Sequence, residues 1–264
     1  MSNIVNIGSP SVWIGCKARR TGGIGARPAV QVAELDLYQG WPQYAIPSQH
    51  QHWPSCVAEA SVNWLEHMIR RFIEPSAIPA FCQLDAIPVW RRARKMFWAD
   101  DEPDAGGLLL DQAFRAMIDL HILPAETTVV RCPTIAEAAT QLHHTPLIMA
   151  NAVTDGWMAG HVNKDTGEIA SQIGRVIPYL SAGHATMCMS FLRQGADLFT
   201  LLQNSWGTGW GRSGCGLMCS DLYNRSALDD FVTCQLPADW TRHNGWQQLL
   251  ISSADQAMPV EVLA

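Results

Sequence analysis

Three residues whose side chains suit nucleophilic catalysis stand far apart in the sequence, in the order Cys56, His184 and Asn204. A cysteine thiolate attacks carbonyl carbons, an imidazole accepts and returns the proton, and an amide oxygen can orient the imidazole ring. Taken singly, a cysteine or a histidine of this kind is more often a packed structural residue. The sequence around each of them therefore decides whether they form one site.

Cys56 stands at the start of a predicted helix in "SCVAEASVNWLEHMIRRFI", and Ser55 is placed to cap that helix. The N-terminus of a helix stabilises negative charge, so this position favours a thiolate. Apolar residues recur at intervals of three or four positions and form one helical stripe. Its members are Ala58, Val62, Leu65, Ile69 and Phe72.

His184 opens the predicted strand "HATMCMSFL", and Asn204 directly follows the predicted strand "LFTLLQ". Their separation fits two adjacent strands joined by a hairpin or a loop, which would bring both side chains to one edge of a sheet. The stretch "NSWGTGWGRSG" places two tryptophans and four glycines behind Asn204. Such a composition predicts a tightly turning loop that holds bulky rings near the asparagine.

Helices are predicted before strands along the chain. "LLLDQAFRAMIDL" follows a Gly-Gly pair and has a helical apolar face, and "TIAEAATQL" begins with a capping box formed by Thr134 and Glu137. After Pro146 come the short apolar runs "LIMANAV", "RVIPYL", "HATMCMSFL" and "LFTLLQ". This order predicts an α+β protein with a helical lobe followed by a sheet or barrel lobe.

The composition excludes several classes of protein. The chain has 264 residues, 48% hydrophobic residues, 16% charged residues and a formal net charge of −6, and its basic runs "CKARR" and "WRRARK" are short. A nucleic-acid interface is therefore not expected, and both runs are interpreted as solvated faces. No apolar run is long enough to span a membrane, and the N-terminus lacks the layout of a secretory signal. These features predict a cytoplasmic or virion-associated protein.

The eight cysteines show neither a C-x-x-C pair nor a second pair at zinc spacing beside Cys215 and Cys219. We interpret most of them as reduced and buried, and we predict no metal and no other cofactor. The glycine-rich "RTGGIGARP" has no preceding strand and no following helix. It is interpreted as part of a flexible arm and not as a phosphate-binding loop.

With these motifs in place, the sequence resembles the papain-like cysteine peptidases. The resemblance rests on "SCVAEAS", "AGGLLLDQAF", "GHATMCMSF" and "NSWGTGWGRSGCGLM", which occur in the family's order. It implies a two-lobe catalytic domain over 41–236, with a helical lobe at about 41–130 and an antiparallel sheet or barrel lobe at about 131–236. Residues 1–40 would then be an N-terminal arm and residues 237–264 a C-terminal tail.

The resemblance also implies a role for each matching residue. Cys56 is the nucleophile, His184 its proton partner, and Asn204 the acceptor of a ring N–H under the cover of Trp206. Trp210 lies beside the leaving-group side of the cleft. The implied reaction is hydrolysis of a peptide or isopeptide bond in a protein or peptide substrate, through a thioester.

Gly106 and Gly107 match the segment that pairs with the substrate backbone. Leu108 and Leu109, which follow them, fit an apolar subsite or the packing of the next helix equally well.

The sequence departs from the family pattern in three ways, and the first two lie just before Cys56. The family's oxyanion glutamine lies six residues before the nucleophile, where this chain has His50. Gln49 is the favoured substitute and Gln51 its rival. Pro54 replaces a usual glycine and removes a backbone N–H.

Trp53 and Asp104 stand where the family has its common disulfide, which is consistent with a reducing compartment. The first 40 residues are too rich in Gly and Pro for the family's helical pro-region. Another restraint on activity is then expected, with the arm itself as one possibility.

Two alternatives remain open from the sequence. The chain could be a structural or binding component of a larger assembly, such as a virion or a secretion complex, with weak or no activity. A partner would then contact the N-terminal arm or the C-terminal tail. The same three residues also fit deamidation or transamidation of a protein glutamine, because only the acceptor of the thioester differs.

Overall fold

The computed structural model describes residues 16–17, 37, 39–45, 47–51, 53–73, 83–98, 107–158, 161–170, 182–195 and 197–251. The helices are α1 (Cys56–Phe72), α2 (Ile87–Phe97), α3 (Leu110–Asp119), α4 (Ile135–Leu142) and α5 (Ser220–Ser226). The strands are β1 (Cys16–Lys17), β2 (Thr128–Cys132), β3 (Leu147–Asn151), β4 (Ala182–Gln194), β5 (Asp197–Gln203), β6 (Cys215–Cys219) and β7 (Phe231–Gln235). Short 3-10 turns occur at Trp41–Tyr44, Asp155–Trp157, Trp240–Arg242 and Gly245–Leu249.

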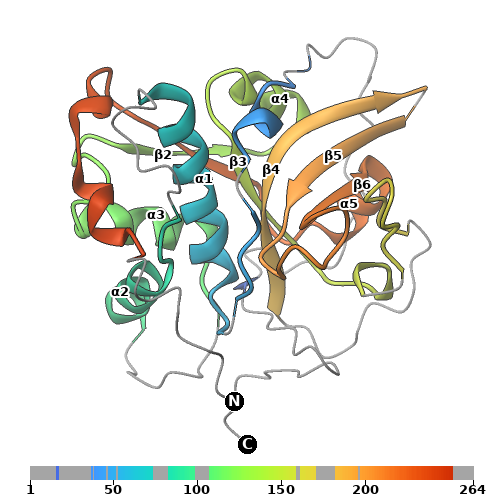
Figure 1. Ribbon diagram of the computed structural model, residues 1–264, viewed down its shortest axis with the longest axis horizontal. Coiled ribbons are helices and arrows are strands. Elements are labelled where there is room, and N and C mark those ends of the chain that lie inside the picture. Colours follow the sequence, from blue (N-terminus) through green and yellow to red (C-terminus); the bar gives the residue numbers. More distant parts are fainter. Residues whose placement is uncertain are drawn as a thin grey trace, which may run out of the picture.

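The strands form one antiparallel sheet in the order β2-β7-β3-β4-β5-β6, and β1 pairs with β4 outside that path. Helices α1, α2 and α3 lie on one side of the molecule, and β4, β5 and β6 lie on the other (Figure 1). The α+β class and the antiparallel sheet are therefore confirmed. The sheet is open and does not close into the barrel that was the other predicted form.

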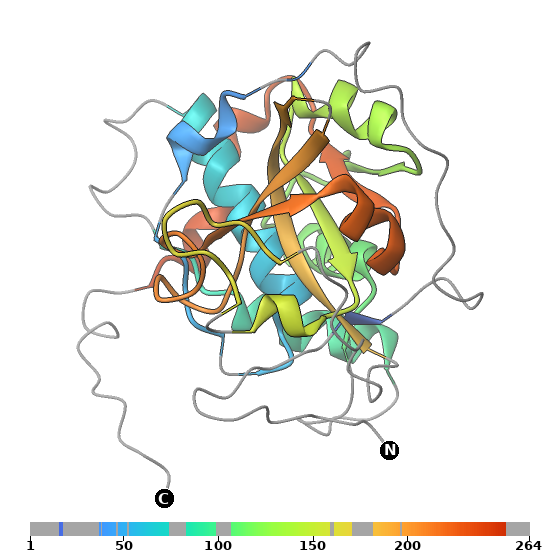
Figure 2. The same cartoon turned by 90° about the vertical axis from the view of Figure 1, so that its right-hand side faces the viewer.

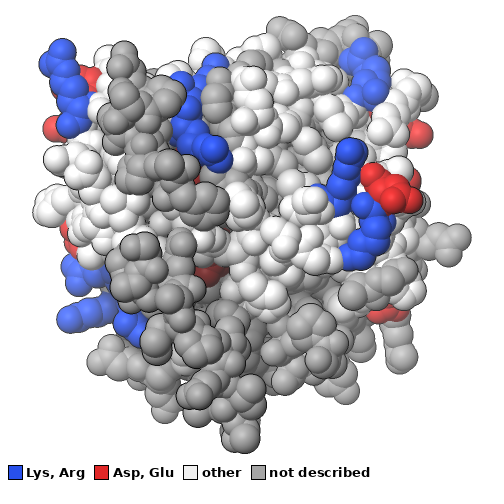
Figure 3. Space-filling model, viewed as in Figure 1, with Lys and Arg blue, Asp and Glu red and all other residues white. Residues whose placement is uncertain are grey.

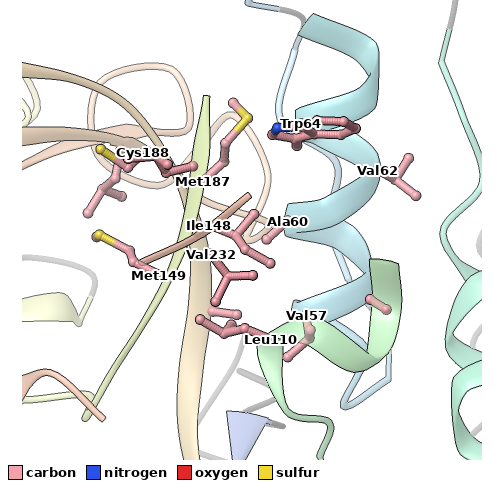
Figure 4. Close-up of a cluster of buried hydrophobic side chains, with 14 of the residues drawn as sticks. Val57, Ala60, Val62, Trp64, Leu110, Ile148, Met149, Met187, Cys188 and Val232 are labelled. Carbon is pink, nitrogen blue, oxygen red and sulfur yellow. The ribbon is translucent and has the colours of Figure 1, made fainter. Parts of the chain in front are cut away.

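Helix α1 lies at the seam between the helices and the sheet, and Figures 1 and 2 both show it beside β4. Val57, Ala60 and Trp64 face the strand residues Ile148, Met187 and Val232, whereas Val62 points to the opposite side (Figure 4). The indole N–H of Trp64 lies 2.7 Å from Thr145 Oγ1 and 3.0 Å from Thr233 Oγ1, so the polar edge of this buried ring is satisfied.

The predicted stripe underestimates how deeply α1 is buried. Every residue from Cys56 to Ile69 is buried, including Glu59, Glu66 and His67, whereas Phe72, the last member of the stripe, is 42% exposed. An apolar period identifies one face of a helix. Here the sheet covers one side of α1, while α2 and α3 cover another, so polar positions are enclosed as well.

Several local predictions are confirmed, and one is wrong in detail. Helix α3 lies within the predicted segment, and α4 begins with the predicted capping box, in which Thr134 Oγ1 accepts the N–H of Glu137. Ser55 is the N-cap residue of α1, but its hydroxyl does not accept a helix N–H. It hydrogen-bonds instead to Glu59 Oε1 at 3.1 Å.

Other elements were not predicted. Helix α2 contains the run "WRRARK", which was interpreted only as a charged exposed face, yet Val89, Trp90 and Ala93 are buried. Strands β2, β6 and β7 were also missed. Strand β2 contains the lobe boundary expected at 130/131 and pairs along its whole length with β7.

The segment after Pro237, expected to be a tail, returns to the helices as far as it is described. Trp240 packs edge-on against Phe72 with 6.0 Å between ring centroids, and Trp246 is buried. Leu250 forms a bridge with Leu84, flanked by the bonds from Asp85 N to Leu249 O at 2.7 Å and from Ile251 N to Gln83 O at 3.1 Å. The last described residues therefore pack against the helical side of the molecule.

Some expectations fall outside the described residues. These are the predicted strand "RVIPYL", Gly106, Asp104, most of the arm and the end of the tail. Among the helices that are described, none is both long and apolar enough to cross a membrane. On the face shown in Figure 3, basic and acidic groups are scattered over a mostly uncharged surface.

A buried histidine in α1 generates the first prediction. His67 is fully buried, its Nδ1 lies 2.9 Å from Asn63 O, and burial lowers its pKa from 6.5 to about 4. The unfolded chain then binds a proton that the folded chain does not, so stability is lost as the pH falls from 6.5 towards 4. Replacing His67 with Leu should reduce the loss between pH 7 and pH 4.5 by on the order of 2–3 kcal/mol.

Urea unfolding at the two pH values measures this difference. His161→Leu, at an exposed position, is the control and should lose as much stability as the wild type. An equal loss in the wild type and in His67→Leu would contradict the prediction.

Candidate active site

The predicted histidine and asparagine meet by a direct hydrogen bond. His184 is the third residue of β4, and Asn204 follows β5, with which β4 pairs. His184 Nε2 donates to Asn204 Oδ1 at 2.6 Å, and both residues are fully buried. The N–H of Ser205 also donates to this oxygen, at 2.8 Å, which identifies the acceptor end of the amide. The ring is thereby fixed with Nε2 as its donor.

This tautomer leaves the other ring nitrogen, Nδ1, as the basic one. Among the described residues, none hydrogen-bonds to His184 Nδ1. Burial lowers the pKa of His184 to about 4, and the bond to Asn204 acts in the opposite direction. At neutral pH the ring is therefore neutral by itself, with Nδ1 able to accept a proton.

Three tryptophans enclose the His184–Asn204 pair. Trp206 stacks on the imidazole with 4.5 Å between ring centroids and 29° between ring planes, as the resemblance implied. Trp157 approaches the imidazole edge-on, with 6.1 Å between ring centroids, and Trp210 stacks on Trp157 with 5.8 Å between ring centroids. An apolar enclosure of this kind strengthens the hydrogen bond between imidazole and amide.

Trp157 was missed by sequence reasoning, because only the lone ring in "TDGW" marks it. The predicted substrate-facing Trp210 is 5% exposed, and its Nε1 donates to Trp157 O at 2.8 Å. Trp210 therefore packs within this aromatic cluster, where it supports the other two rings.

The loop after Asn204 turns as its glycines predicted. Gly211 has φ +52°, and a Cβ there would lie 2.2 Å from Cys215 O. Gly214 has φ +87°, and a Cβ there would lie 2.3 Å from Ser48 Cβ. Both positions exclude side chains, so the loop can close tightly over the rings.

The segment before Cys56 is paired with this same loop. Gln51 N donates to Ser205 O at 2.8 Å, Gly207 N donates to Gln49 O at 2.9 Å, and His50 lies opposite Trp206 in an antiparallel bridge. The hydroxyl of Ser48 also donates to Asn204 O. The segment that leads into α1 is therefore attached to the loop that carries Asn204, only five residues before Cys56.

Cys56 is the first residue of α1 and is fully buried. Helix α1 packs along β4, and both elements begin at the lower end of the molecule in Figure 1. The fold thus brings the start of the predicted nucleophile helix and the start of the histidine strand to the same end of the seam. This arrangement is supported by the backbone bonds between residues 49–51 and the loop after Asn204, and by the packing of α1 along β4.

The two candidate glutamines have different surroundings. Gln49 Nε2 donates to Leu84 O at 2.9 Å, towards the helical side. Gln51 is 2% exposed, its Oε1 accepts from the Ser205 hydroxyl, and its Nε2 donates to Trp53 O at 3.1 Å. Gln51 therefore lies between the asparagine loop and the cysteine segment.

The remaining predicted positions lie around this seam. Gly107 is buried, and Gly106 lies outside the described residues. Pro54 is buried, and Trp53 stacks on Trp90 of α2 at 5.9 Å. Strand β1 pairs Cys16 with Gly183 and Lys17 with Ala182, directly before His184.

Four of the described cysteines have thiols that are harder to ionise than an ordinary thiol. Burial raises the pKa of Cys132 and of Cys215 to about 11, and it also raises the pKa of Cys188 and Cys234. All of them are thiols without disulfides. Over the part of the chain that the structure describes, no three His, Cys, Asp or Glu residues gather as a metal site.

Comparisons with known proteins identify solved structures that share this fold. No family model matches the sequence, and no curated protein matches it either. The solved structure of digestive procathepsin L 3 from Tenebrio molitor larval midgut is similar, with a TM-score of 0.52 and 14% identity over 84% of this chain and 76% of that one.

The bromelain protease of Ananas comosus, solved in complex with the E64 inhibitor, has a TM-score of 0.53 and 15% identity, covering 79% of this chain and 100% of its own. The Carica candamarcensis cysteine protease CMS1MS2, also in complex with E-64, has a TM-score of 0.51 and 17% identity, covering 76% and 98%. These similarities extend over most of each molecule. The chain therefore has the fold of the papain-like cysteine peptidases.

Proposed function

We propose that this protein is a cysteine peptidase that hydrolyses peptide or isopeptide bonds through Cys56, His184 and Asn204. The observation that carries the proposal is the 2.6 Å bond from His184 Nε2 to Asn204 Oδ1 beneath Trp206. The pairing of the Cys56 segment with the same asparagine loop supports it.

In the proposed reaction, the Cys56 proton passes to His184 Nδ1 and the thiolate attacks the carbonyl carbon of the substrate. The imidazolium then gives its proton to the departing amine as the carbon–nitrogen bond breaks, which leaves a thioester on Cys56. A water molecule, deprotonated by Nδ1, attacks the thioester and releases the acid. Cys56 recovers its proton in this step. Asn204 holds the ring throughout, because its oxygen bonds the nitrogen that does not take part.

The negative oxygen of the intermediates needs hydrogen-bond donors. The backbone N–H of Cys56, at the start of α1, is one proposed donor. Gln49 was favoured from the sequence for the second, but its amide is directed at Leu84 O. Gln51 Nε2 also donates to a backbone carbonyl, Trp53 O, but this carbonyl belongs to the segment that leads into Cys56. This position, between that segment and Ser205, favours Gln51 as the side-chain donor.

An extended peptide is the proposed substrate form. The pairing of β1 with Ala182 and Gly183 indicates that the backbone edge next to His184 accepts an extended segment by strand addition. Cys56 and His184 are both fully buried in the described conformation. Productive binding therefore requires a rearrangement that exposes the sulfur.

The same burial favours a second candidate function, a binding component on a papain-like scaffold with little or no activity. In that case the buried Cys56 would react no faster than other cysteines of the chain. The two candidates differ in one measurable property, the intrinsic reactivity of Cys56.

Cys56 should be alkylated by iodoacetamide at pH 6 faster than the other seven cysteines, because only this thiol is proposed to share its proton with His184. His184→Ala should remove the preference, and Cys56→Ala should abolish peptide hydrolysis without unfolding the chain. Peptide mapping by mass spectrometry measures the first result. Cys215, which is partly exposed, serves as the internal reference. Uniform labelling of all cysteines would favour the scaffold instead.

Asn204→Ala should lower kcat/KM by roughly tenfold to a hundredfold, because His184 loses one charge-assisted hydrogen bond and its fixed tautomer. The loss should be smaller than in Cys56→Ala. Steady-state hydrolysis of a fluorogenic peptide gives both values. An Asn204→Ala enzyme with wild-type kcat/KM would contradict the role of the amide.

Gln51→Ala should lower kcat about a hundredfold, as expected for loss of one oxyanion donor. Gln49→Ala, the matched control, should change kcat only a few-fold. Cys56 alkylation, which forms no oxyanion, should proceed at a similar rate in both variants. The reverse order of kcat losses would assign the role to Gln49.

A further inference from the structure

A buried carboxyl group lies in the first turn of α1, next to the proposed nucleophile along the helix. Glu59 is in the first turn of α1, three residues after Cys56, and is 6% exposed. Residues three apart in a helix are neighbours on one face. The proposed triad does not use this acid.

The carboxyl group is attached to the residue that precedes Cys56. Glu59 Oε1 accepts the hydroxyl of Ser55 at 3.1 Å, and Glu59 N donates to Ser55 O at 2.9 Å. Ser55 N in turn donates to Trp53 O at 2.7 Å, the same oxygen that accepts Gln51 Nε2. Glu59 therefore belongs to a continuous set of hydrogen bonds around the start of α1.

The groups that face Glu59 give it no positive partner among the described residues. Asp85, from the segment before α2, adds a second negative charge nearby. Glu66, two turns further along α1, accepts the N–H of Leu84 at 2.7 Å and is influenced by Glu59 and by Arg70. Burial is the main cause that raises the pKa of Glu59 to about 7, Asp85 adds to it, and the Ser55 bond opposes it.

We infer that Glu59 is a positioning residue for Cys56: its carboxyl group holds Ser55, and in its ionised form it opposes a thiolate one turn away. This inference rests on the proposed function, because it concerns the reactivity of the same sulfur. A neutral carboxylic acid leaves the helix N-terminus free to stabilise the thiolate. A buried carboxylate on the same face cancels part of that stabilisation.

The pH dependence follows from the two groups. Below about pH 4, His184 is protonated and Cys56 keeps its own proton, so reactivity rises as the pH passes that value. As the pH rises through about 7, Glu59 loses its proton and reactivity falls. The wild type should therefore react fastest in weakly acidic solution.

The experiment measures the rate constant for iodoacetamide alkylation of Cys56 in the full chain, from pH 4 to pH 8. The wild-type rate constant should fall about tenfold between pH 6 and pH 8. Glu59→Gln, which keeps the size and the acceptor oxygen of the side chain, should lose this fall. Glu66→Gln, a buried acid further along the same helix, is the matched control and should retain it.

Ser55→Ala adds a readout that a merely structural role would not move. The Ser55 hydroxyl lowers the pKa of Glu59, so its removal should shift the fall in rate to higher pH. Unfolding midpoints from circular dichroism show whether each variant is folded at the pH of measurement.

A fall that persists in Glu59→Gln, or that disappears equally in Glu66→Gln, would overturn the inference while the proposed function stands. Absence of selective, His184-dependent labelling at every pH would overturn both. A fall that is lost only in Glu59→Gln and shifted upward in Ser55→Ala is the expected result.

Discussion

The bond between His184 and Asn204 is the interaction on which the rest of the site depends. It exists because β4 and β5 are adjacent and antiparallel, so that the first residues of one strand lie near the end of the other. It is kept dry by Trp206 and supported by Trp157 and Trp210. The pairing of the two strands thus sets the distance between the side chains of His184 and Asn204. The aromatic cluster excludes water, so that a single hydrogen bond can hold the imidazole in one orientation.

The asparagine loop has a second task, because it also anchors the segment that leads into α1. Backbone bonds from Gln51 and Gly207 join the two stretches, and the Ser205 hydroxyl donates to Gln51 Oε1 between them. A displacement of the loop would therefore move the ring and the start of the nucleophile helix together. The two halves of the proposed site are coupled through one structural element, although one half is carried by a helix and the other by the sheet.

Much of this could be predicted from the sequence, because the signals were local. Helix α1 carries an apolar period, α4 carries a capping box, and the two strands that position His184 and Asn204 are short apolar runs bounded by turn residues. The glycines after Asn204 predicted the tight loop. The spacing between His184 and Asn204 was informative because two short strands joined by a hairpin must lie side by side.

The features that were missed depend on distant partners. Helix α2 looked like a charged surface run because its buried face is narrow, and β2 and β7 become strands only by pairing with each other across the chain. Glu59 is buried because the sheet covers one side of α1 and the helices α2 and α3 cover another. The apolar period within α1 cannot predict this, because it identifies only one face of the helix. The choice between Gln49 and Gln51 likewise depended on which carbonyl and hydroxyl groups lie nearby.

The pairing of β2 with β7 has a consequence for the order of events during synthesis. Thr128 lies opposite Gln235, and the described chain then returns to residues 83–85, so the helical side is completed by residues that are synthesised after the whole described sheet. Contacts between such distant residues form slowly, since a large loop must first be closed. Until these residues have been synthesised, the nascent chain keeps apolar faces uncovered, a state in which chains aggregate or engage chaperones.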